Sequence, residues 1–385
     1  MKRKICVVIT ARPSYSRIKT VLAAISQSDL LELQIVLAGA ALLERYGNME
    51  SIIERDGFKI SKKIFMVLEG ENVTSMAKTT GLGILELSDA FYNLSPDVVM
   101  VIGDRYETIA VSIAATFQNI PLAHIQGGEI TGSIDEKVRH ANTKLADIHF
   151  VSNEEAYKRV VRLGEDPAYI FNTGCPSIDL VTELANGKNG LDFNIYSKYG
   201  GVGHQPEVSS GYVVVMQHPV TNESADARRQ IMETLEAVKN LPLAVLWFWP
   251  NIDAGADGIS KGIRAFREKN RLPHMHFFKN MEPHDFLKLL YNSKCLIGNS
   301  SVGIRECAFM GVPVVNIGTR QDGRDRGNNV IDVDYSHEEI AAAVQQCIQN
   351  PAPEPSGIYG RGNAGITVAG ILEKIPLRYH KKNKF

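Results

Sequence analysis

The stretch Leu296-Ile-Gly-Asn-Ser-Ser-Val-Gly-Ile-Arg-Glu306 joins a short apolar run to residues that commonly begin a helix. Its apolar start predicts a β-strand, and Asn299, Ser300 and Ser301 are residue types favoured at helix N-caps. An apolar helical pattern then continues through Phe309. We therefore predict a strand that leads directly into a helix, which is the repeating step of α/β proteins.

The same alternation of strand and helix runs through most of the chain. Short β-branched runs predict strands, and apolar residues between them recur with helical spacing. In the first half, strands are predicted at 5–10, 33–38, 98–102, 121–125 and 148–151, and helices at 16–25, 74–93, 107–117, 136–146 and 154–163. The alternation resumes at 212–216 and continues to 317. It indicates an α/β protein with two doubly wound parallel sheets.

The periodicity is lost between 184 and 210, which predicts a domain boundary. We expect a Rossmann-like N-terminal domain over 1–185, a linker over 186–210 and a Rossmann-like C-terminal domain over 211–357. This layout resembles the glycosyltransferase-B arrangement. That resemblance implies two domains facing a cleft and a final helix, within 358–385, that completes the first domain.

Composition excludes several classes of protein. The 385 residues are 44% hydrophobic and 22% charged, with a net charge of -1, which is typical of globular domains and gives no general attraction to nucleic acid or membranes. No apolar stretch approaches the roughly 20 residues of a spanning helix, and the start is not a convincing signal peptide. The odd, scattered cysteines predict reduced thiols in the cytoplasm and no metal site: Cys6, Cys175, Cys295, Cys307 and Cys347.

The opening stretch also predicts an anion site. Unpaired backbone N–H groups and the helix dipole favour negative charge at a helix N-terminus, and Ser300 and Ser301 add two hydroxyls. Gly303 leaves room for close approach. Glu306 is out of register for a capping box, so it is free for another role, such as holding a ribose. The alternative is ordinary helix capping by the serines.

Nearby arginines can add positive charge to this site. The loop after the next predicted strand carries Arg320, Arg324 and Arg326. After the first predicted strand, Arg12 is placed to meet an anion, unless it is a surface side chain. We therefore predict that the chain binds a diphosphate.

Carboxylates follow two neighbouring strands of the first series. Asp104 lies three residues before Glu107, which fits a capping box, and on local grounds capping is favoured over catalysis. In the Gly-rich loop after the next strand, Ser133 and Glu136 fit a capping box. Glu129 and Asp135 are left without a structural role. Crowded carboxylates push their pKa values apart and so supply an acid and a base.

Two loops of the second series hold further candidates. His218 follows the predicted strand at 212–216, where an imidazole could donate a proton to a leaving phosphate near neutral pH; the alternative is a histidine bonded to a backbone carbonyl. Asn251 lies in a loop that follows Trp249 and could line a nucleoside, or this loop could be an ordinary turn.

Eight short motifs in order resemble one family, the hydrolysing UDP-N-acetylglucosamine 2-epimerases of sialic acid biosynthesis. The similarity covers about residues 4 to 375, and this chain is similar to the stand-alone bacterial type. Gln126 stands where non-hydrolysing relatives typically have Glu. The motifs are Thr10-Ala-Arg-Pro-Ser-Tyr15, Gly103-Asp-Arg-Tyr-Glu107, Gln126-Gly-Gly-Glu129, Gly132-Ser-Ile-Asp-Glu136, Gln217-His-Pro-Val220, Pro250-Asn-Ile-Asp-Ala-Gly255, Gly298-Asn-Ser-Ser301 and Gly318-Thr-Arg-Gln321.

The resemblance implies an activity that needs no cofactor and no metal. A base removes the C2 proton of the sugar while UDP leaves C1, and water adds to the resulting 2-acetamidoglycal with inversion at C2. The products are UDP and N-acetylmannosamine, used for sialic acid and so for capsule or surface polysaccharide. The family also implies a homo-oligomer, dimer or tetramer.

The resemblance also implies roles for individual residues. The acid–base set is Asp104, Glu129 and Asp135, and His218 lies near the reacting sugar or phosphate. The substrate-binding set is Arg12, Arg17, Asn251, Ser300, Ser301, Gly303, Glu306 and Arg320.

Other activities remain to be weighed against this one. The nearest alternative is the same reaction on UDP-2,4-diacetamido-2,4,6-trideoxyglucose, in the legionaminic acid pathway, and no residue separates the two substrates. A UDP-sugar glycosyltransferase would need an acceptor site, and the balanced charge and three loop acids argue against it. A non-catalytic sugar-nucleotide sensor would not need Asp104, Glu129 and Asp135.

Overall fold

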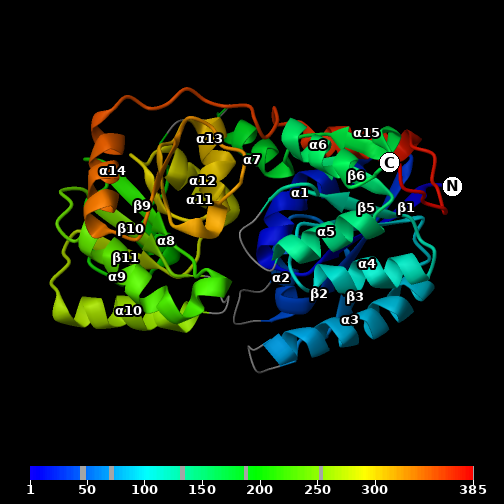
Figure 1. The fold of residues 1–385 in the computed structure, drawn as a ribbon, viewed down its shortest axis with the longest axis horizontal. Helices are drawn as coiled ribbons and strands as arrows, with labels where there is room; N and C mark the ends of the chain where they lie inside the picture. The colour runs from blue at the N-terminus through cyan, green and yellow to red at the C-terminus, as the bar shows by residue number, and fades with distance from the viewer. Residues whose placement is uncertain (44–48, 69–72, 131–134, 186–189, 251–254, 385) are drawn as a thin grey trace. The chain divides into compact units, whose positions relative to one another are not determined.

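The computed structural model describes residues 1–43, 49–68, 73–130, 135–185, 190–250 and 255–384 (Figure 1). The chain divides into two compact units. Unit 1 comprises Met1–Glu129, Asp135–Leu180 and Tyr359–Phe385, and unit 2 comprises Ile130–Ile134 and Val181–Ile358. The last segment of the chain therefore belongs with the first.

Unit 1 is built on a parallel sheet whose first strand is an interior strand. Within the described residues the strand order is β3-β2-β1-β4-β5-β6-β7, with every pairing parallel. Strand order reverses between β1 and β4, where doubly wound sheets bind ligands. The strands are β1 (Arg3–Ile9), β2 (Leu31–Ala38), β3 (Ile60–Ile64), β4 (Val98–Ile102), β5 (Leu122–Ile125), β6 (Ile148–Val151) and β7 (Ile170–Asn172).

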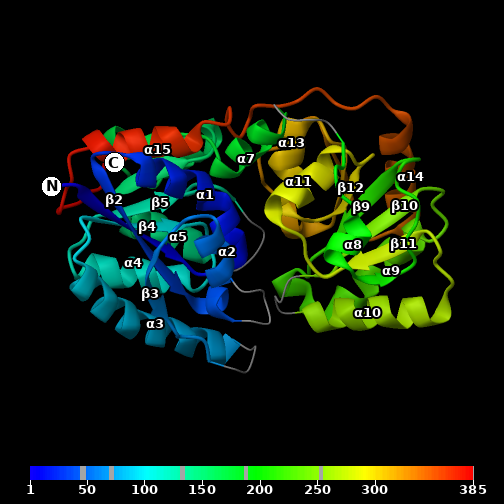
Figure 2. The ribbon, with the colours of Figure 1, turned by 180° about the vertical axis from the view of Figure 1, so that it is seen from behind.

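Helices cover both faces of this sheet, because the strands are apolar on both sides. One core contains α1, α2 and α15 residues, and the other contains α3 and α4 residues; Figures 1 and 2 show α1 beside α15 and α3 beside α4. The helices are α1 (Arg12–Gln27), α2 (Met49–Arg55), α3 (Val73–Leu94), α4 (Thr108–Phe117), α5 (Asp135–Leu145), α6 (Glu154–Arg162), α7 (Pro176–Ala185) and α15 (Ala364–Lys374), with 3-10 turns η1 (Gly39–Leu42) and η3 (Pro167–Tyr169).

The final helix is fixed to unit 1 by a buried aspartate. Asp179 accepts hydrogen bonds from the backbone N–H groups of Ala364 (2.9 Å) and Gly365 (2.7 Å) at the start of α15. These are donors that a helix N-terminus otherwise leaves unpaired. A side chain at Gly365 would meet the backbone of Thr20 in α1 at 2.6 Å, so the glycine permits close packing of the two helices.

Unit 2 repeats the pattern with a second sheet, ordered β14-β13-β12-β9-β10-β11-β8 among the described residues. Only β8 runs antiparallel to its neighbour there. The strands are β8 (Val202–Gly203), β9 (Tyr212–Met216), β10 (Ala244–Phe248), β11 (Met275–Phe278), β12 (Leu296–Gly298), β13 (Val314–Ile317) and β14 (Val330–Val333).

Helices α9, α10 and α14 contribute to one core of unit 2, and α11 packs against α13. The helices are α8 (Ile195–Tyr199), α9 (Ala227–Val238), α10 (Ala256–Lys269), α11 (Pro283–Tyr291), α12 (Ser301–Ile304), α13 (Glu306–Met310) and α14 (His337–Gln349), with 3-10 turns η4 (Thr221–Asp226) and η5 (Thr319–Gln321). The region 186–210, predicted to be an irregular linker, contains α8 and β8.

No helix within the described residues is both long and apolar enough to cross a membrane.

Candidate functional site

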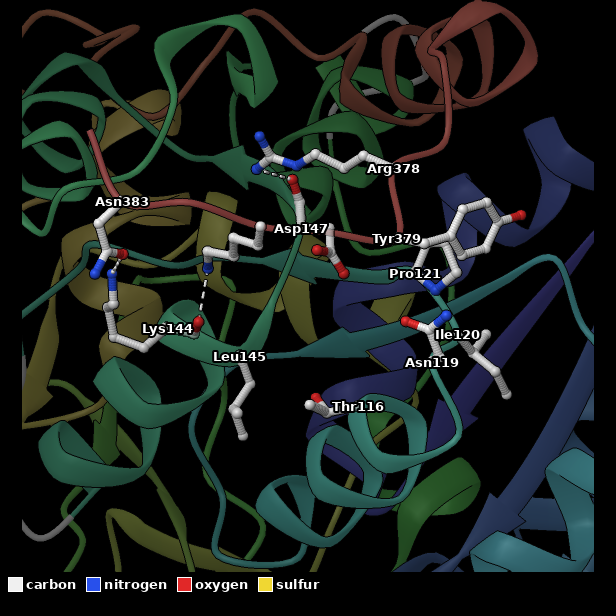
Figure 3. Close-up of a pocket in the computed structure, with 11 residues that line it drawn as sticks. Thr116, Asn119, Ile120, Pro121, Lys144, Leu145, Asp147, Arg378, Tyr379 and Asn383 are labelled. Carbon is white, nitrogen blue, oxygen red and sulfur yellow. Dashed lines mark hydrogen bonds between the residues drawn. The ribbon is translucent and has the colours of Figure 1, made fainter.

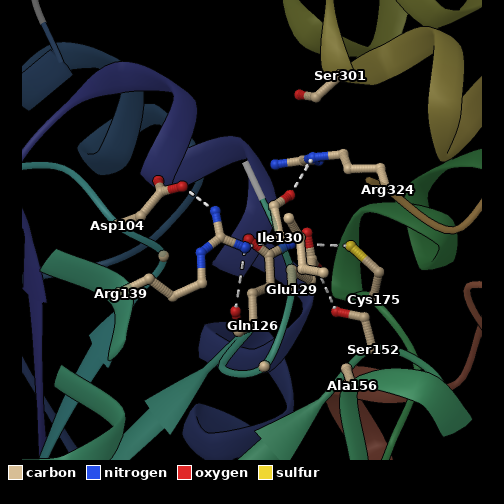
Figure 4. Close-up of polar contacts among 12 residues, drawn as sticks. Asp104, Gln126, Glu129, Ile130, Arg139, Ser152, Ala156, Cys175, Ser301 and Arg324 are labelled. Carbon is tan, nitrogen blue, oxygen red and sulfur yellow. Dashed lines mark hydrogen bonds and ion pairs between the residues drawn. The ribbon is translucent and has the colours of Figure 1, made fainter. Parts of the chain in front are cut away.

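The carboxyl ends of β4 and β5 in unit 1 carry two acids that share one arginine. Asp104 follows β4, Glu129 follows β5, and Arg139 projects from α5. The Arg139 guanidinium pairs with the Asp104 carboxylate and lies 3.3 Å from Oε2 of Glu129 (Figure 4). Arg139 and Glu129 are almost fully buried, so each charge is compensated inside the protein, as buried charges require.

Glu129 is held from a second side. Its Oε1 accepts a hydrogen bond from the hydroxyl of Ser152 (2.8 Å), which follows β6. The loop reaches this position because Gly128 has a φ of +75° and passes so close to α6 that a Cβ there would lie 2.4 Å from the backbone oxygen of Ala156 (Figure 4). Only glycine fits at this point.

Gln126 begins the same loop in a strained conformation. Its φ is +65°, which is uncommon for a residue with a side chain and clusters at functional sites. Its amide nitrogen donates to the Sγ of Cys175 (3.0 Å), and its amide oxygen lies 3.5 Å from NH1 of Arg17 on α1. Arg17, expected to bind substrate, therefore lies beside the carboxylate loop.

The capping interpretation of Asp104 is wrong. Helix α4 begins at Thr108 without a side-chain cap, and Glu107 pairs instead with Arg105 at 3.2 Å. Asp104 is therefore available to Arg139. We also expected these carboxylates to crowd one another directly. Instead, the Arg139 cation lies between Asp104 and Glu129 and pairs with both.

Asp135 and Arg12 lie at helix starts in unit 1. Asp135 is the first residue of α5 and lies one turn before Arg139, so both project from the same face of the helix. Arg12 is the first residue of α1, which begins four residues earlier than the predicted start at Ser16. Pro13 in the first turn explains the earlier start, since proline is preferred there.

A buried histidine contacts both the β4 loop and α5 next to the acid cluster. Nε2 of His124 lies 2.9 Å from the backbone oxygen of Gly103, next to Asp104, and Nδ1 lies 3.1 Å from Oγ1 of Thr143 on α5. Burial lowers the pKa of His124 to about 4, so the ring is neutral at neutral pH. It therefore links the β4 loop to α5 without adding charge.

The second group of candidates lies at the carboxyl ends of β9, β12 and β13 in unit 2. His218 follows β9, and its backbone N–H donates to Oδ1 of Asn299 (2.7 Å), whose Nδ2 donates back to the His218 oxygen (2.8 Å). The close approach of these two loops depends on Gly298, where a Cβ would lie 2.1 Å from the oxygen of Met216. This role for the Asn299 side chain was not predicted, because Asn299 was expected only to begin the helix.

The environment of His218 favours its neutral form. Burial and the positive charge of Arg320 lower the pKa of His218 to about 3, which disfavours the imidazolium acid that the sequence led us to expect. A neutral ring can still donate one hydrogen bond and accept another.

The serines after β12 take two different roles. Ser300 is the N-cap of α12, and its Oγ accepts from the N–H of Val302 (3.5 Å). Ser301 Oγ accepts from NH2 of the buried Arg305 (3.0 Å). The helix predicted to run through Phe309 is broken at Arg305 into α12 and α13. The short helix α12 has only a small dipole to attract an anion, and the Arg305 guanidinium supplies positive charge instead.

Gly303 and Glu306 also differ in their roles. A Cβ on Gly303 would lie 2.9 Å from a methyl carbon of Val314, so this glycine lets α12 pack on the sheet and does not make room for a ligand. Glu306 is buried, and among the described residues its Oε2 accepts no hydrogen bond; Nε of Arg305 lies 3.8 Å away. Glu306 thus remains available for a ligand.

The loop after β13 brings donors to the same place. Arg320 NH1 (3.1 Å) and the Gln321 amide (2.8 Å) both donate to the backbone oxygen of Asn299. Arg324 and Arg326 make other contacts: Nε of Arg324 donates to the oxygen of Ile130 (3.0 Å), and Arg326 pairs with Asp332. Asn251 and Ser133 lie outside the described residues.

Two functional candidates were missed from the sequence. Arg139 lies four residues after Asp135, and this helical spacing was a usable signal. Arg305 lies inside an apolar helical pattern, where a charged residue needs a partner. Among the described residues, no three His, Cys, Asp or Glu side chains are grouped as metal ligands.

Comparisons with known proteins identify the family of this chain. Residues 23–373 match the family model described as UDP-N-acetylglucosamine 2-epimerase. The chain is 34% identical to the UDP-N,N'-diacetylbacillosamine 2-epimerase (hydrolyzing) of Legionella pneumophila, covering 100% of this chain and 99% of that protein. It is also 34% identical to the GDP/UDP-N,N'-diacetylbacillosamine 2-epimerase (hydrolyzing) of Campylobacter jejuni, covering 86% of this chain and 84% of that one.

Solved structures share the fold. The UDP-GlcNAc 2-epimerase of Neisseria meningitidis bound to UDP-GlcNAc superimposes with a TM-score of 0.80 at 19% identity, covering 96% of this chain and 100% of that one. The two-sheet α/β architecture predicted from the sequence, with its similarity to the glycosyltransferase-B fold, is confirmed. From the family match and the full-length relatives, this chain belongs to the UDP-N-acetylglucosamine 2-epimerase family.

Proposed function

We propose that this protein is a hydrolysing 2-epimerase that converts a UDP-2-acetamido sugar and water into UDP and the free 2-epimeric sugar. The observation that carries the proposal is the group of Asp104, Glu129 and Arg139 at the carboxyl ends of β4 and β5, with Asp135 on the same face of α5 as Arg139. Carboxylates fixed by a buried cation can exchange protons with a sugar without moving.

The reaction proceeds by elimination and then addition. A carboxylate of the acid–base set removes the C2 proton, the electron pair forms the C1–C2 double bond, and the C1–O bond breaks as UDP leaves. Water then adds its hydroxyl to C1, and a proton is delivered to C2 on the opposite face. Family membership together with two hydrolysing relatives supports this sequence of steps.

The two units have different tasks in this proposal. Unit 1 supplies proton transfer through Asp104, Glu129 and Asp135. Unit 2 binds the leaving nucleotide, with Arg320, Ser300 and Ser301 on the diphosphate and Glu306 on the ribose hydroxyls. The cations and hydroxyls at the ends of β12 and β13 support this assignment, because arginine forms strong, charge-assisted hydrogen bonds to phosphate.

Further binding roles are proposed for four side chains, from their positions. Neutral His218 donates a hydrogen bond to a phosphate oxygen. Arg305 adds positive charge beside Ser301. Arg12 and Arg17 bind the anionic substrate from the start of α1.

The substrate to test first is UDP-N,N'-diacetylbacillosamine, because the two relatives at 34% identity described above are named for that sugar. The second is UDP-N-acetylglucosamine, which was the first expectation from the sequence and is bound in the Neisseria structure. The free sugar would then be N-acetylmannosamine or its 4-acetamido-6-deoxy analogue. Either would serve the synthesis of acidic surface sugars.

The deciding experiment is proton NMR of the purified chain with each UDP-sugar in deuterated water. Release of UDP together with a free 2-epimer carrying deuterium at C2 establishes the reaction and its elimination–addition route. Faster turnover of one sugar identifies the substrate. The proposal fails if UDP binds but neither sugar is consumed, and the Asp104→Asn variant controls for a contaminating activity.

We also propose that the protein acts in the cytoplasm as a homo-oligomer. Leu85 (68% exposed) and Tyr92 (80% exposed) lie seven residues apart on one face of α3, and Phe117 at the end of α4 is 87% exposed. Exposed apolar residues mark a protein interface where they form one contiguous patch, and the family resemblance also implies a homo-oligomer. Light scattering after gel filtration should give the mass of a dimer or tetramer, and a monomer at micromolar concentration would contradict the proposal.

A further inference from the structure

The C-terminal tail, Arg378–Lys384, is attached to the end of the helix that carries active-site residues. Helix α5 has 11 residues, with Asp135 and Arg139 in its first half. At its other end, Nζ of Lys381 donates to the backbone oxygens of Lys144 (2.6 Å) and Ala146 (2.6 Å) and lies 3.4 Å from that of Thr143. Lys381 is separated from these residues by more than 230 positions in the sequence.

Lys381 provides a hydrogen-bond donor for the carbonyl oxygens at the C-terminal end of α5. The last four carbonyl oxygens of a helix have no partner within it, and a cation near them is favourable because the helix dipole is negative there. Lys381 is only 16% exposed in its side chain. It therefore acts as a C-cap supplied from a distant part of the chain.

A buried carboxylate fixes the lysine in this place. Oε2 of Glu165 lies 2.6 Å from Nζ of Lys381, and Oε1 lies 2.6 Å from Nζ of Lys144; His149 lies 3.1 Å from Oε2. Burial alone would raise the pKa of Glu165, but the hydrogen bonds from His149, Lys144 and Lys381 lower it to about 2. Glu165 is thus ionised across the physiological range.

The rest of the tail is anchored around the same point. Arg378 donates to the oxygen of Asp147 (2.8 Å) and stacks 3.8 Å above the ring of Tyr169. Nζ of Lys144 donates to Oδ1 of Asn383 (2.8 Å), and the N–H of Lys384 donates to the oxygen of Gly164 (2.8 Å). Figure 3 shows Arg378, Lys144 and Asn383 around a cavity of about 430 Å³.

This cavity could be interpreted as an anion site, but its contacts argue against that. Lys144, Arg378 and Lys381 already bond carbonyl oxygens, and Lys144 and Lys381 are paired with Glu165. Asp147 also lines the cavity. The cations therefore hold the tail in place.

The path from the tail to the acid cluster is short. Thr143, whose oxygen faces Lys381, donates its hydroxyl to the backbone oxygen of Arg139 (3.0 Å). The same hydroxyl oxygen lies 3.1 Å from Nδ1 of His124, whose other nitrogen faces Gly103, next to Asp104. A displacement of the C-terminal end of α5 would therefore also displace Arg139 and the loop that carries Asp104.

We propose that the C-terminal tail is a positioning element for α5, and that Lys381, by capping this helix, sets the placement of Arg139 and Asp135. The inference rests on the proposed function, because it assumes that these two residues work in the acid–base site. The inference adds that residues at the opposite edge of the sheet from the acid–base site control the rate of the reaction.

The test compares Lys381→Met with Lys382→Met, a matched control in which the neighbouring exposed lysine is changed. We expect Lys381→Met to lower kcat about tenfold while KM stays nearly constant, since small displacements of catalytic groups are costly in rate. Lys381→Arg should recover most of the rate. Hydrogen exchange followed by mass spectrometry should show faster exchange across α5 in Lys381→Met and no change in unit 2 peptides.

The two readouts separate the possible failures. Unchanged exchange in α5, or unchanged kcat in an active enzyme, overturns the positioning role. If the wild-type chain turns over neither UDP-sugar, the proposed function fails, and the exchange data still decide whether Lys381 holds α5. Should Lys381→Met not be recovered folded, Lys381→Gln keeps a donor without the charge and is judged by the same readouts.

Discussion

The two candidate clusters occupy equivalent positions in their sheets and yet differ in charge. In unit 1, the buried Arg139 is matched by the carboxylates of Asp104 and Glu129. In unit 2, Arg320 donates to a backbone oxygen, and Arg305 donates to a hydroxyl and lies 3.8 Å from the Glu306 carboxylate; neutral His218 lies nearby. One arginine accompanies two carboxylates in unit 1 and two arginines accompany one carboxylate in unit 2, so the first cluster suits proton transfer and the second suits an anion.

The largest expected effect comes from breaking the unit 1 cluster. Asp104→Asn should lower turnover by about 10²–10⁴, the usual contribution of one acid or base, and leave UDP affinity nearly unchanged. Chromatographic assay of UDP release and calorimetric titration with UDP measure the two quantities. Glu155→Gln, at an exposed ion pair on α6, is the control; a large loss of UDP affinity in Asp104→Asn would argue that the tasks are not divided between the units.

The converse change removes a cation from unit 2. Arg320→Gln should weaken UDP binding by about 10- to 100-fold, because a hydrogen bond to a charged group contributes roughly 1.5–3 kcal/mol, while kcat at saturating substrate changes little. Arg320→Lys should be intermediate. Titration calorimetry gives the affinities, with the exposed Arg271→Gln as the control. If kcat falls while affinity is kept, Arg320 belongs to the chemistry and not to binding.

A third change separates the stabilities of the two units. Asp179→Ala removes the cap of α15 and should destabilise unit 1 by about 1–3 kcal/mol, since buried N–H donors lose their acceptor. Both tryptophans, Trp247 and Trp249, belong to unit 2. In urea titrations, circular dichroism should therefore shift to lower denaturant while tryptophan fluorescence does not. The exposed Asp29→Ala should leave both curves in place, and a joint shift would show that the units unfold together.

The smallest effect is the response to mild acid. The buried ring of His124 has a pKa of about 4, below the usual value near 6.5, so between these values the unfolded chain binds a proton that the folded chain does not. Stability should be constant above pH 7 and fall below pH 6.5, by about 1 kcal/mol per such histidine over the first pH unit. Thermal unfolding from pH 8 to 5 measures this loss. His124→Gln should reduce the slope seen by circular dichroism by the share of one histidine, since His218 also has a lowered pKa; an unchanged slope would assign the effect to other groups.

Much of the architecture could be predicted from the sequence, because local patterns determine strands and the residues that follow them. The placement of Asp104 after β4 and of Ser300 after β12 followed directly from apolar runs that end in polar residues. The partner of Asp104 could not be predicted in this way. Arg139 reaches it across 35 residues, and the local D-x-x-E spacing pointed to a cap that does not form. The break at Arg305 was missed for a related reason, since its charge is satisfied by contacts that an apolar helical pattern does not reveal.

The assignment of Tyr359–Phe385 to unit 1 has a consequence for synthesis on the ribosome. Residues 181–358 are contiguous, so unit 2 can complete its core as soon as they emerge. Unit 1 is synthesised first but must wait for α15 and the cap at Asp179. Domains generally fold in the order of their synthesis, whereas here we expect the unit that is made first to complete its core last.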